Sequence, residues 1–150
     1  MQRWFDQFAL LLTTAWVGAL WAIGFLAVQV LFRNLDSAIA GTLAGQMFTW
    51  LSYFGIVSAF ALMIHRVFSF GVEALKQAYF WILVVMLALI LAGQFGIQPI
   101  LAHLKSQAGA VDVMQSVFAD RFKHWHGIAS IAYLVECILG GALVLKAKAA

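Results

Sequence analysis

The last apolar stretch of the chain carries polar side chains that could bind a proton, a cation or a small polar solute. Four of them are spaced three or four residues apart: His126, Ser130, Tyr133 and Glu136. At about 3.6 residues per helical turn, this spacing places all four along one face of a helix. Such a face could bind an ion, relay a proton or hold the amine of a ligand, with Glu136 as its acidic group.

Glu136 is the most informative of these residues because it lies near the middle of an apolar segment. Burying an acid at the centre of a bilayer costs about 2.5 kcal/mol or more on insertion scales. We therefore expect the carboxyl to be protonated and neutral, and to have a function. The alternative is a structural carboxyl that is hydrogen-bonded to Ser58, Tyr53 or a backbone carbonyl.

Glutamines are expected at the same membrane depth as His126 and Ser130. In a bundle whose spans alternate in direction, the half on the side of the first and third loops contains Gln29, Gln46, Gln94 and Gln98. Unpaired amides are costly in lipid, so we expect these side chains to face one another or a small wet cavity. The alternative is plain helix–helix adhesion by hydrogen bonds, each worth about 1 kcal/mol.

The four histidines do not form a recognisable metal motif. His124 and His126 are two residues apart and point to opposite faces of a helix. A pair across the bundle, His103 with His126, is the metal or haem candidate, and His65 is expected near the opposite surface. Since neither H-x-x-x-H nor H-E-x-x-H occurs, we predict no metal site and no cofactor. A haem- or copper-binding protein is the alternative.

No catalytic template fits the chain. A P-loop, a G-x-S-x-G and a Gly-rich dinucleotide motif are all absent. Ser130 and His126 share a helix face, but the interior of a helix offers no oxyanion hole for a serine nucleophile. We therefore do not expect an enzyme.

The composition indicates which elements must position these groups. The chain has 150 residues, of which 65% are hydrophobic and 10% are charged, whereas soluble domains are about half apolar and about a quarter charged. This predicts an integral membrane protein with one domain over residues 1–150.

Its nine basic residues are scattered at expected helix ends, which argues against nucleic-acid binding. With a single cysteine, Cys137, no intrachain disulfide can form.

Several stretches are long enough to cross a bilayer, which requires about 20 apolar residues. They cover about residues 8–32, 44–68, 78–101 and 122–145. Because lipid admits only helices or closed barrels, and no alternation of period two is present, we predict an all-α, up-down bundle of four transmembrane helices. Trp16 and Trp21, deep in the first span, are interpreted as packing residues. Pro99 is expected near the end of the third helix, where few backbone bonds are lost.

An even number of spans places both termini on one side of the membrane. That side is expected to hold five basic residues (Arg3, Arg66, Lys76, Lys146 and Lys148), and the other side four (Arg33, Lys105, Arg121 and Lys123). Basic residues favour the cytoplasmic side, so the difference predicts cytoplasmic termini. Arg121 and Lys123 would anchor the last helix at the lipid headgroups.

The segment "RFKHWHGIASIAYLVECILGGALVL" resembles the last span of small four-helix membrane proteins related to transmembrane protein 205. In that family an arginine–phenylalanine pair and a histidine–glycine–x–x–serine enter the last helix. Here these are Arg121, Phe122, His126, Gly127 and Ser130. The first span, "WVGALWAIGFLAVQVLFRNL", is similar as well, as are the "AGQMF" that opens the second span and the proline late in the third. The likeness covers nearly the whole chain.

The resemblance implies a four-span bundle in a bacterial inner membrane and picks out His126, but it implies no established activity. Gly127 is expected to let a neighbouring helix approach closely. We expect the protein to bind or pass a small solute or ion through a polar intramembrane cavity formed by the α-helical stripe and the four glutamines. The alternatives are a haem or copper redox protein and an accessory subunit of a larger membrane complex. The lipid bilayer is an expected partner. A second copy of the chain or a larger membrane complex is another, and nucleic acid is not expected.

Overall fold

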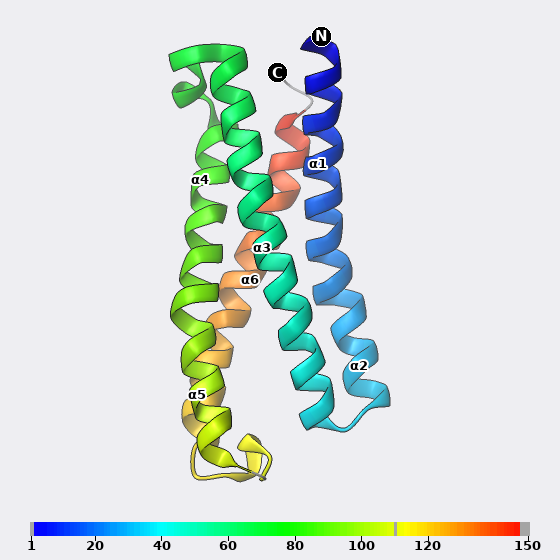
Figure 1. Ribbon diagram of the computed structural model, residues 1–150, viewed down its shortest axis with the longest axis vertical. Helices are drawn as coiled ribbons and strands as arrows, with labels where there is room; N and C mark the ends of the chain where they lie inside the picture. Colours follow the sequence, from blue (N-terminus) through cyan, green and yellow to red (C-terminus); the bar gives the residue numbers. More distant parts are fainter. Residues whose placement is uncertain (1, 110, 148–150) are drawn as a thin grey trace.

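The structure is a computed structural model that describes residues 2–109 and 111–147, and the regular elements in these ranges are helical (Figure 1). They follow in the order α1 (Gln2–Ala22), η1 (Ile23–Ala27), α2 (Val28–Asn34), α3 (Ser37–Phe70), η2 (Gly71–Lys76), α4 (Ala78–Leu91), η3 (Ala92–Ile97), α5 (Gln98–Ala108), η4 (Val113–Gln115) and α6 (Ala119–Ala147). Of the short η elements, η1 and η3 are π-helical turns, and η2 and η4 are 3-10 turns.

These elements join into four helices that are long and apolar enough to cross a membrane. They cover Arg3–Asn34, Ser37–Lys76, Ala78–Ala108 and Ala119–Ala147. The helices alternate in direction, and α1 begins at the end of the bundle where α6 ends (Figure 1). The predicted all-α, up-down membrane bundle is therefore confirmed. The helices extend beyond the predicted spans because hydropathy marks the hydrocarbon layer, about 30 Å thick, whereas helical hydrogen bonding continues past it.

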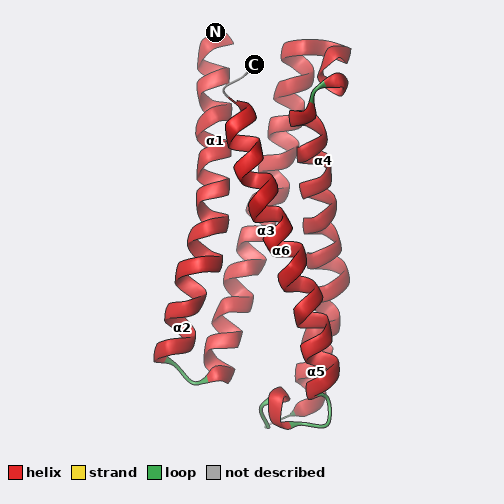
Figure 2. Cartoon of the chain, turned by 180° about the vertical axis from the view of Figure 1, so that it is seen from behind, coloured by secondary structure: helices red, strands yellow, loops and turns green. Residues whose placement is uncertain are grey.

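The four spans form a closed ring of neighbours. α1 packs against α3 and α6, and α4 packs against the same two helices (Figure 2). The side chains that are buried almost completely include Trp16, Leu20, Leu62, Leu83, Met86 and Leu143. Many other large apolar side chains are exposed on the outer surface, as expected of helices that are hydrophobic on every side and face lipid.

The sequence predicts Pro99 near the end of the third helix. In the structure it lies inside the third span, because α5 continues to Ala108. The π turn η3 directly precedes it, and Gln98 N–H donates to the carbonyl of Gly93, five residues back. A proline in an α-helix lacks one N–H donor and clashes with the carbonyl four residues before it. We attribute the continuity of the span to this wider turn, which displaces the carbonyls that a proline would meet.

The connection between α5 and α6 is tied to the start of α3 by a carboxylate. The Ser37 hydroxyl donates to Oδ2 of Asp112 at 2.6 Å, and Met114 N–H donates to its Oδ1 at 2.9 Å. The bond from Ser37, and then that from Met114, lower the pKa of Asp112 below its ordinary value, and the charge of Lys105 adds to this effect.

Replacing Ser37 with alanine is expected to raise the pKa of Asp112 towards the ordinary value of about 3.9. Because the folded pKa is the lower one, the carboxylate contacts stabilise the loop fully above about pH 4 and are lost as the pH falls through the folded value. An NMR titration of the Asp112 carboxyl in the wild type and in Ser37→Ala measures the shift. The control is Thr42→Ala, because the Thr42 hydroxyl bonds to the carbonyl of Ala38 in the same helix. The same shift in both variants would contradict the assignment.

Candidate functional site

A cavity of about 300 Å³ lies in the half of the bundle that contains α2 and α5, away from the end where α1 begins (Figure 1). All four spans contribute to its walls, among them Gly24 of the first, Phe48 of the second, Gln94 of the third and Glu136 of the fourth. Ligand pockets in proteins are usually about 300–1,000 Å³, so this cavity suits a small ligand.

Most of the residues that the sequence analysis singled out line this cavity. Those that do so are Gln94, Gln98, His126, Ser130, Tyr133 and Glu136. Gln29 and Gln46 are absent from the described lining, and both side chains are exposed. They lie at the expected level of the bundle, but their helices are rotated so that these amides face outward.

Glu136 is the acidic group of the cavity. Its exposed fraction is 8%, and its carboxyl forms no hydrogen bond or ion pair with any residue in the described part of the chain. Ser58 and Tyr53, the two side chains expected as structural partners, do not bond to the Glu136 carboxyl. Ser58 Oγ is buried without a partner among the described residues, and Tyr53 is exposed. No lysine or arginine is among the lining residues described. The carboxyl is therefore an uncompensated group that faces the cavity.

Two further polar atoms of the lining residues are buried and have no partner among residues 2–109 and 111–147. They are the Nε1–H donor of Trp16 and the Oε1 acceptor of Gln94. An unpaired buried polar group costs about 1–3 kcal/mol, so native proteins retain few of them without a reason. With Glu136, these residues give the site one unused donor and an excess of unused acceptors.

Trp16 is a cavity residue that the sequence does not reveal, because its depth in the first span is as typical of a packing residue as that of Trp21. The two indoles differ in the structure: Trp21 Nε1–H donates to the carbonyl of Cys137 at 3.1 Å, and Trp16 Nε1–H has no acceptor among the residues that the structure describes. Gly55 makes room for Trp16, since a Cβ at Gly55 would lie 2.9 Å from its Nε1. The two residues belong to different spans, so local sequence carried no signal for this contact.

Tyr133 forms a fixed wall of the cavity. Its hydroxyl donates to the carbonyl of Leu20. Its ring packs edge-on against Phe48, with 5.0 Å between the ring centroids. Gly24 lies so close that a Cβ there would overlap Cε1 of Tyr133. The phenol is therefore held on three sides, by α1, α3 and η1.

The two π turns lie at the level of the cavity and contribute to its lining. Gly24 belongs to η1, and Gly93, Gln94 and Ile97 belong to η3. A π turn inserts an extra residue into a helical turn, changes the direction of the side chains around it and is frequent at functional sites. We infer that these turns direct Gly24 towards Tyr133 and the Gln94 amide towards the cavity.

His126 and Ser130 are the most exposed of the polar lining residues and lie towards the mouth of the cavity. The Ser130 hydroxyl donates to the carbonyl of His126 at 2.8 Å. The imidazole stacks on Phe122, with 5.8 Å between ring centroids and 9° between the ring planes. The backbone bond of Ser130 is a local one within α6, so this serine does not need a partner on another helix.

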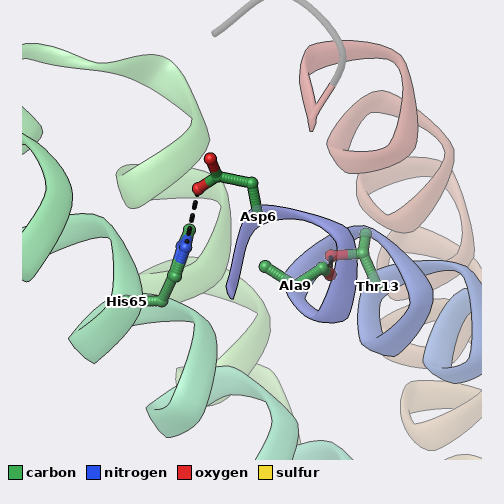
Figure 3. Close-up of polar contacts among 4 residues, drawn as sticks. All are labelled: Asp6, Ala9, Thr13 and His65. Atoms are coloured by element: carbon green, nitrogen blue, oxygen red, sulfur yellow. Dashed lines mark hydrogen bonds and ion pairs between the residues drawn. The ribbon is translucent and has the colours of Figure 1, made fainter. Parts of the chain in front are cut away.

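The histidines do not converge on one point. His103 lines a second pocket with Arg121 and Trp125, whereas His126 lines the cavity. His65 lies near the start of α1, where its Nε2 is 3.1 Å from Oδ1 of Asp6 (Figure 3). In the described part of the chain, no group of three or more His, Cys, Asp or Glu side chains could hold a metal ion.

Arg66, which was expected to be a surface cation, is buried with an exposed fraction of 7%. Its guanidinium carbon lies 4.3 Å from the ring centroid of Tyr79 and 4.9 Å from that of Phe70. Tyr79 is positioned in turn by a hydrogen bond of 3.2 Å between its hydroxyl and Thr13 Oγ1. Cation–π stacking therefore replaces the expected headgroup contact. Lys148, another cation assigned to this side, lies outside the described residues.

The close helix approach expected at Gly127 is not found, because no atom described lies within 4 Å of the position that its Cβ would take. The helices approach most closely at other glycines. A Cβ would meet Tyr133 at Gly24, Trp16 and Ile90 at Gly55, and Val17 at Gly140. Another helix therefore contacts α6 closely about two and about four turns further along, around Tyr133 and Gly140.

Comparison with known sequences identifies one family. Residues 11–110 match the family described as "Domain of unknown function (DUF4149)". The match covers most of the first span and all of the second and third, and it ends before α6, which carries His126, Ser130, Tyr133 and Glu136. Neither the curated proteins nor the solved structures contain a match to the chain.

Proposed function

The chain belongs to the DUF4149 family of domains of unknown function, and we propose that it binds or passes a small solute or ion through its intramembrane cavity. The observation that carries this proposal is Glu136, a buried acid with no partner in the described residues that lines a cavity with two other unpaired buried polar atoms. An ionisable residue in that environment is costly unless it has a ligand for at least part of its cycle. A binding or passage role, without catalysis, accounts for the cost.

Two features favour solute handling over simple helix adhesion. Adhesion by hydrogen bonds requires that the polar groups bond to one another across helices. Here Glu136 and Gln94 Oε1 have no partner within the described part of the chain, and the Ser130 hydroxyl bonds within its own helix. Tyr133 does join two spans through its bond to Leu20, but Glu136, Gln94 Oε1 and Ser130 do not join helices.

A cysteine-accessibility experiment tests the proposal. In a Cys137→Ala background, which removes the only native thiol, Ser130→Cys places a thiol at the cavity mouth. We expect a positively charged methanethiosulfonate reagent to modify it about tenfold faster than a negatively charged one, because an approaching cation stabilises the ionised form of Glu136 and is attracted by it, whereas an anion is not. The modified fraction is measured by intact mass spectrometry, and Glu136→Gln should remove the preference for positive charge.

Ile131→Cys is the matched control. Ile131 is the next residue of the same helix, but its side chain is 67% exposed and is not among the lining residues described. A lipid-facing thiol at this position should react slowly with both reagents. Equal reactivity at the two positions, or none at Ser130→Cys, would contradict the proposed function.

We infer kinship with the transmembrane protein 205 family from the residues quoted above. We also propose a bacterial inner membrane as the location, with the termini in the cytoplasm, which the distribution of basic residues supports. The lipid bilayer is the proposed partner, and self-association or membership of a larger complex is an alternative to the monomer. Purification in mild detergent followed by mass measurement of the intact assembly distinguishes these states.

A further inference from the structure

The chemistry of the cavity narrows the class of its ligand. We propose that the cavity binds a small protonated primary amine, a short apolar body with an ammonium group directed towards Glu136 and Gln94. This inference rests on the proposed function and specifies its ligand. The charge, the hydrogen-bonding capacity and the aromatic and apolar walls of the cavity each select this class of ligand.

Charge selects a cation. Glu136 is the one carboxylic acid among the lining residues described, and no lysine or arginine accompanies it. A buried carboxylate needs a counter-charge and hydrogen-bond donors to be stable in its ionised form. Because no lysine or arginine lines the cavity and the Glu136 carboxyl accepts no hydrogen bond from the described residues, a ligand that carries both a positive charge and donors satisfies the site, whereas an anionic ligand would add a second unpaired charge.

Hydrogen-bonding capacity selects a ligand with several N–H donors. An ionised Glu136 carboxylate only accepts hydrogen bonds, and the buried Gln94 Oε1 is also an unused acceptor. Of the hydroxyl donors nearby, Tyr133 donates to Leu20 and Ser130 donates to His126, and the buried Trp16 Nε1–H is the single indole donor among the described lining residues that a ligand could still use. A primary ammonium has three N–H donors and no acceptor, which matches this excess.

Aromatic and apolar walls favour an organic ammonium over a metal cation. Trp16, Phe48 and Tyr133 line the same cavity as the acid, and aromatic rings attract ammonium groups by cation–π interaction. The remaining wall is mostly aliphatic, for example Leu51 and Ile90, which suits a short alkyl body. Hard metal cations require about six or more oxygen ligands, and the described residues contain no metal-binding cluster.

Isothermal titration of the purified full-length chain with propylammonium tests the inference, with 1-butanol as the neutral ligand of similar size and potassium as the inorganic cation. We expect propylammonium to bind at least about tenfold more tightly than either, since a hydrogen bond to a charged group contributes more than a factor of ten. Glu136→Gln should reduce the affinity for propylammonium by about tenfold or more and leave butanol unaffected.

Glu73→Gln is the matched control, because Glu73 is an exposed acid at the other end of the bundle that pairs with Lys76 at 2.8 Å. It should bind propylammonium like the wild type. Gln94→Leu provides a second variant that keeps the carboxyl, and it should weaken amine binding without weakening butanol binding. Unchanged amine affinity in both Glu136→Gln and Gln94→Leu, or a preference for butanol or potassium, would overturn the inference.

The two proposals fail in different ways. If cationic reagents reach Ser130→Cys but propylammonium neither binds nor slows that reaction, the cavity serves a different solute. The ligand class is then wrong while the proposed function stands. If no reagent reaches Ser130→Cys, both proposals are wrong.

Discussion

Replacing Glu136 with methionine is expected to make the protein more stable and not less. Methionine has a similar unbranched shape, and it removes a polar group that is 8% exposed and has no partner among the described residues. A buried polar group without a partner costs about 1–3 kcal/mol, which an apolar side chain of similar volume does not incur. We expect about 1 kcal/mol here, because the cavity lets water solvate the carboxyl in part. Amine binding should be lost at the same time.

Thermal unfolding in detergent, followed by loss of monodisperse protein, measures this change in stability. Glu136→Gln retains a polar side chain and should stabilise less than Glu136→Met, and Glu73→Gln should leave stability nearly unchanged because surface ion pairs contribute little. A clear loss of stability in Glu136→Met would show that the carboxyl makes a stabilising bond, and the functional interpretation of Glu136 would then fail. Gain of stability with loss of binding is typical of a functional residue.

Replacing Gly24 with alanine is expected to destabilise the protein by about 1–3 kcal/mol. In an unobstructed helix the same change stabilises by up to about 1 kcal/mol, since glycine is a poor helix former. At Gly24, however, the added Cβ would overlap the Tyr133 ring, whose hydroxyl is 3.0 Å and whose Cζ is 3.1 Å from that position. Moving the ring would break its hydrogen bond to Leu20, and overpacking alone costs about 1–3 kcal/mol.

Gly18→Ala is the matched control because Gly18 lies in α1, six residues before Gly24, with no atom within 4 Å of its Cβ position among the described residues. It should be neutral or stabilising in the same thermal assay. Adding Tyr133→Leu to Gly24→Ala should recover part of the loss, since the two residues are in contact and their effects are not additive. If Gly24→Ala is as stable as Gly18→Ala, Tyr133 does not close the cavity wall against α1 and η1 in the way described.

Much of the candidate site could be predicted from the sequence because depth and helical period are local properties. The spacing of His126, Ser130, Tyr133 and Glu136 follows from 3.6 residues per turn, and all four line the cavity. The alternation of spans predicted that Gln94 and Gln98 would lie at the same level as His126, and they do. These steps need only the hydropathy of the chain and the direction of each helix.

What the sequence could not determine is the rotation of each helix about its axis. A soluble helix reveals its inner face because that face is apolar, but a helix in lipid is apolar on every side. For this reason Gln29 and Gln46 face outward although they lie at the expected depth, and Trp16 lines the cavity although Trp21 does not. The π turns η1 and η3 change the rotation further, within spans that read as uninterrupted helices.

The sequence by itself therefore determined the class, the four spans, their up-down order and the polar stripe on α6, because each depends on composition or on the period of a single helix. Only the tertiary structure decided that Glu136 has no partner among the described residues, that Arg66 is buried between Tyr79 and Phe70, and that Gly24, Gly55 and Gly140 are glycines at close contacts. Each of these features joins residues from different spans, and apolar helices in lipid carry little information in their sequence about which residues of another helix they will meet.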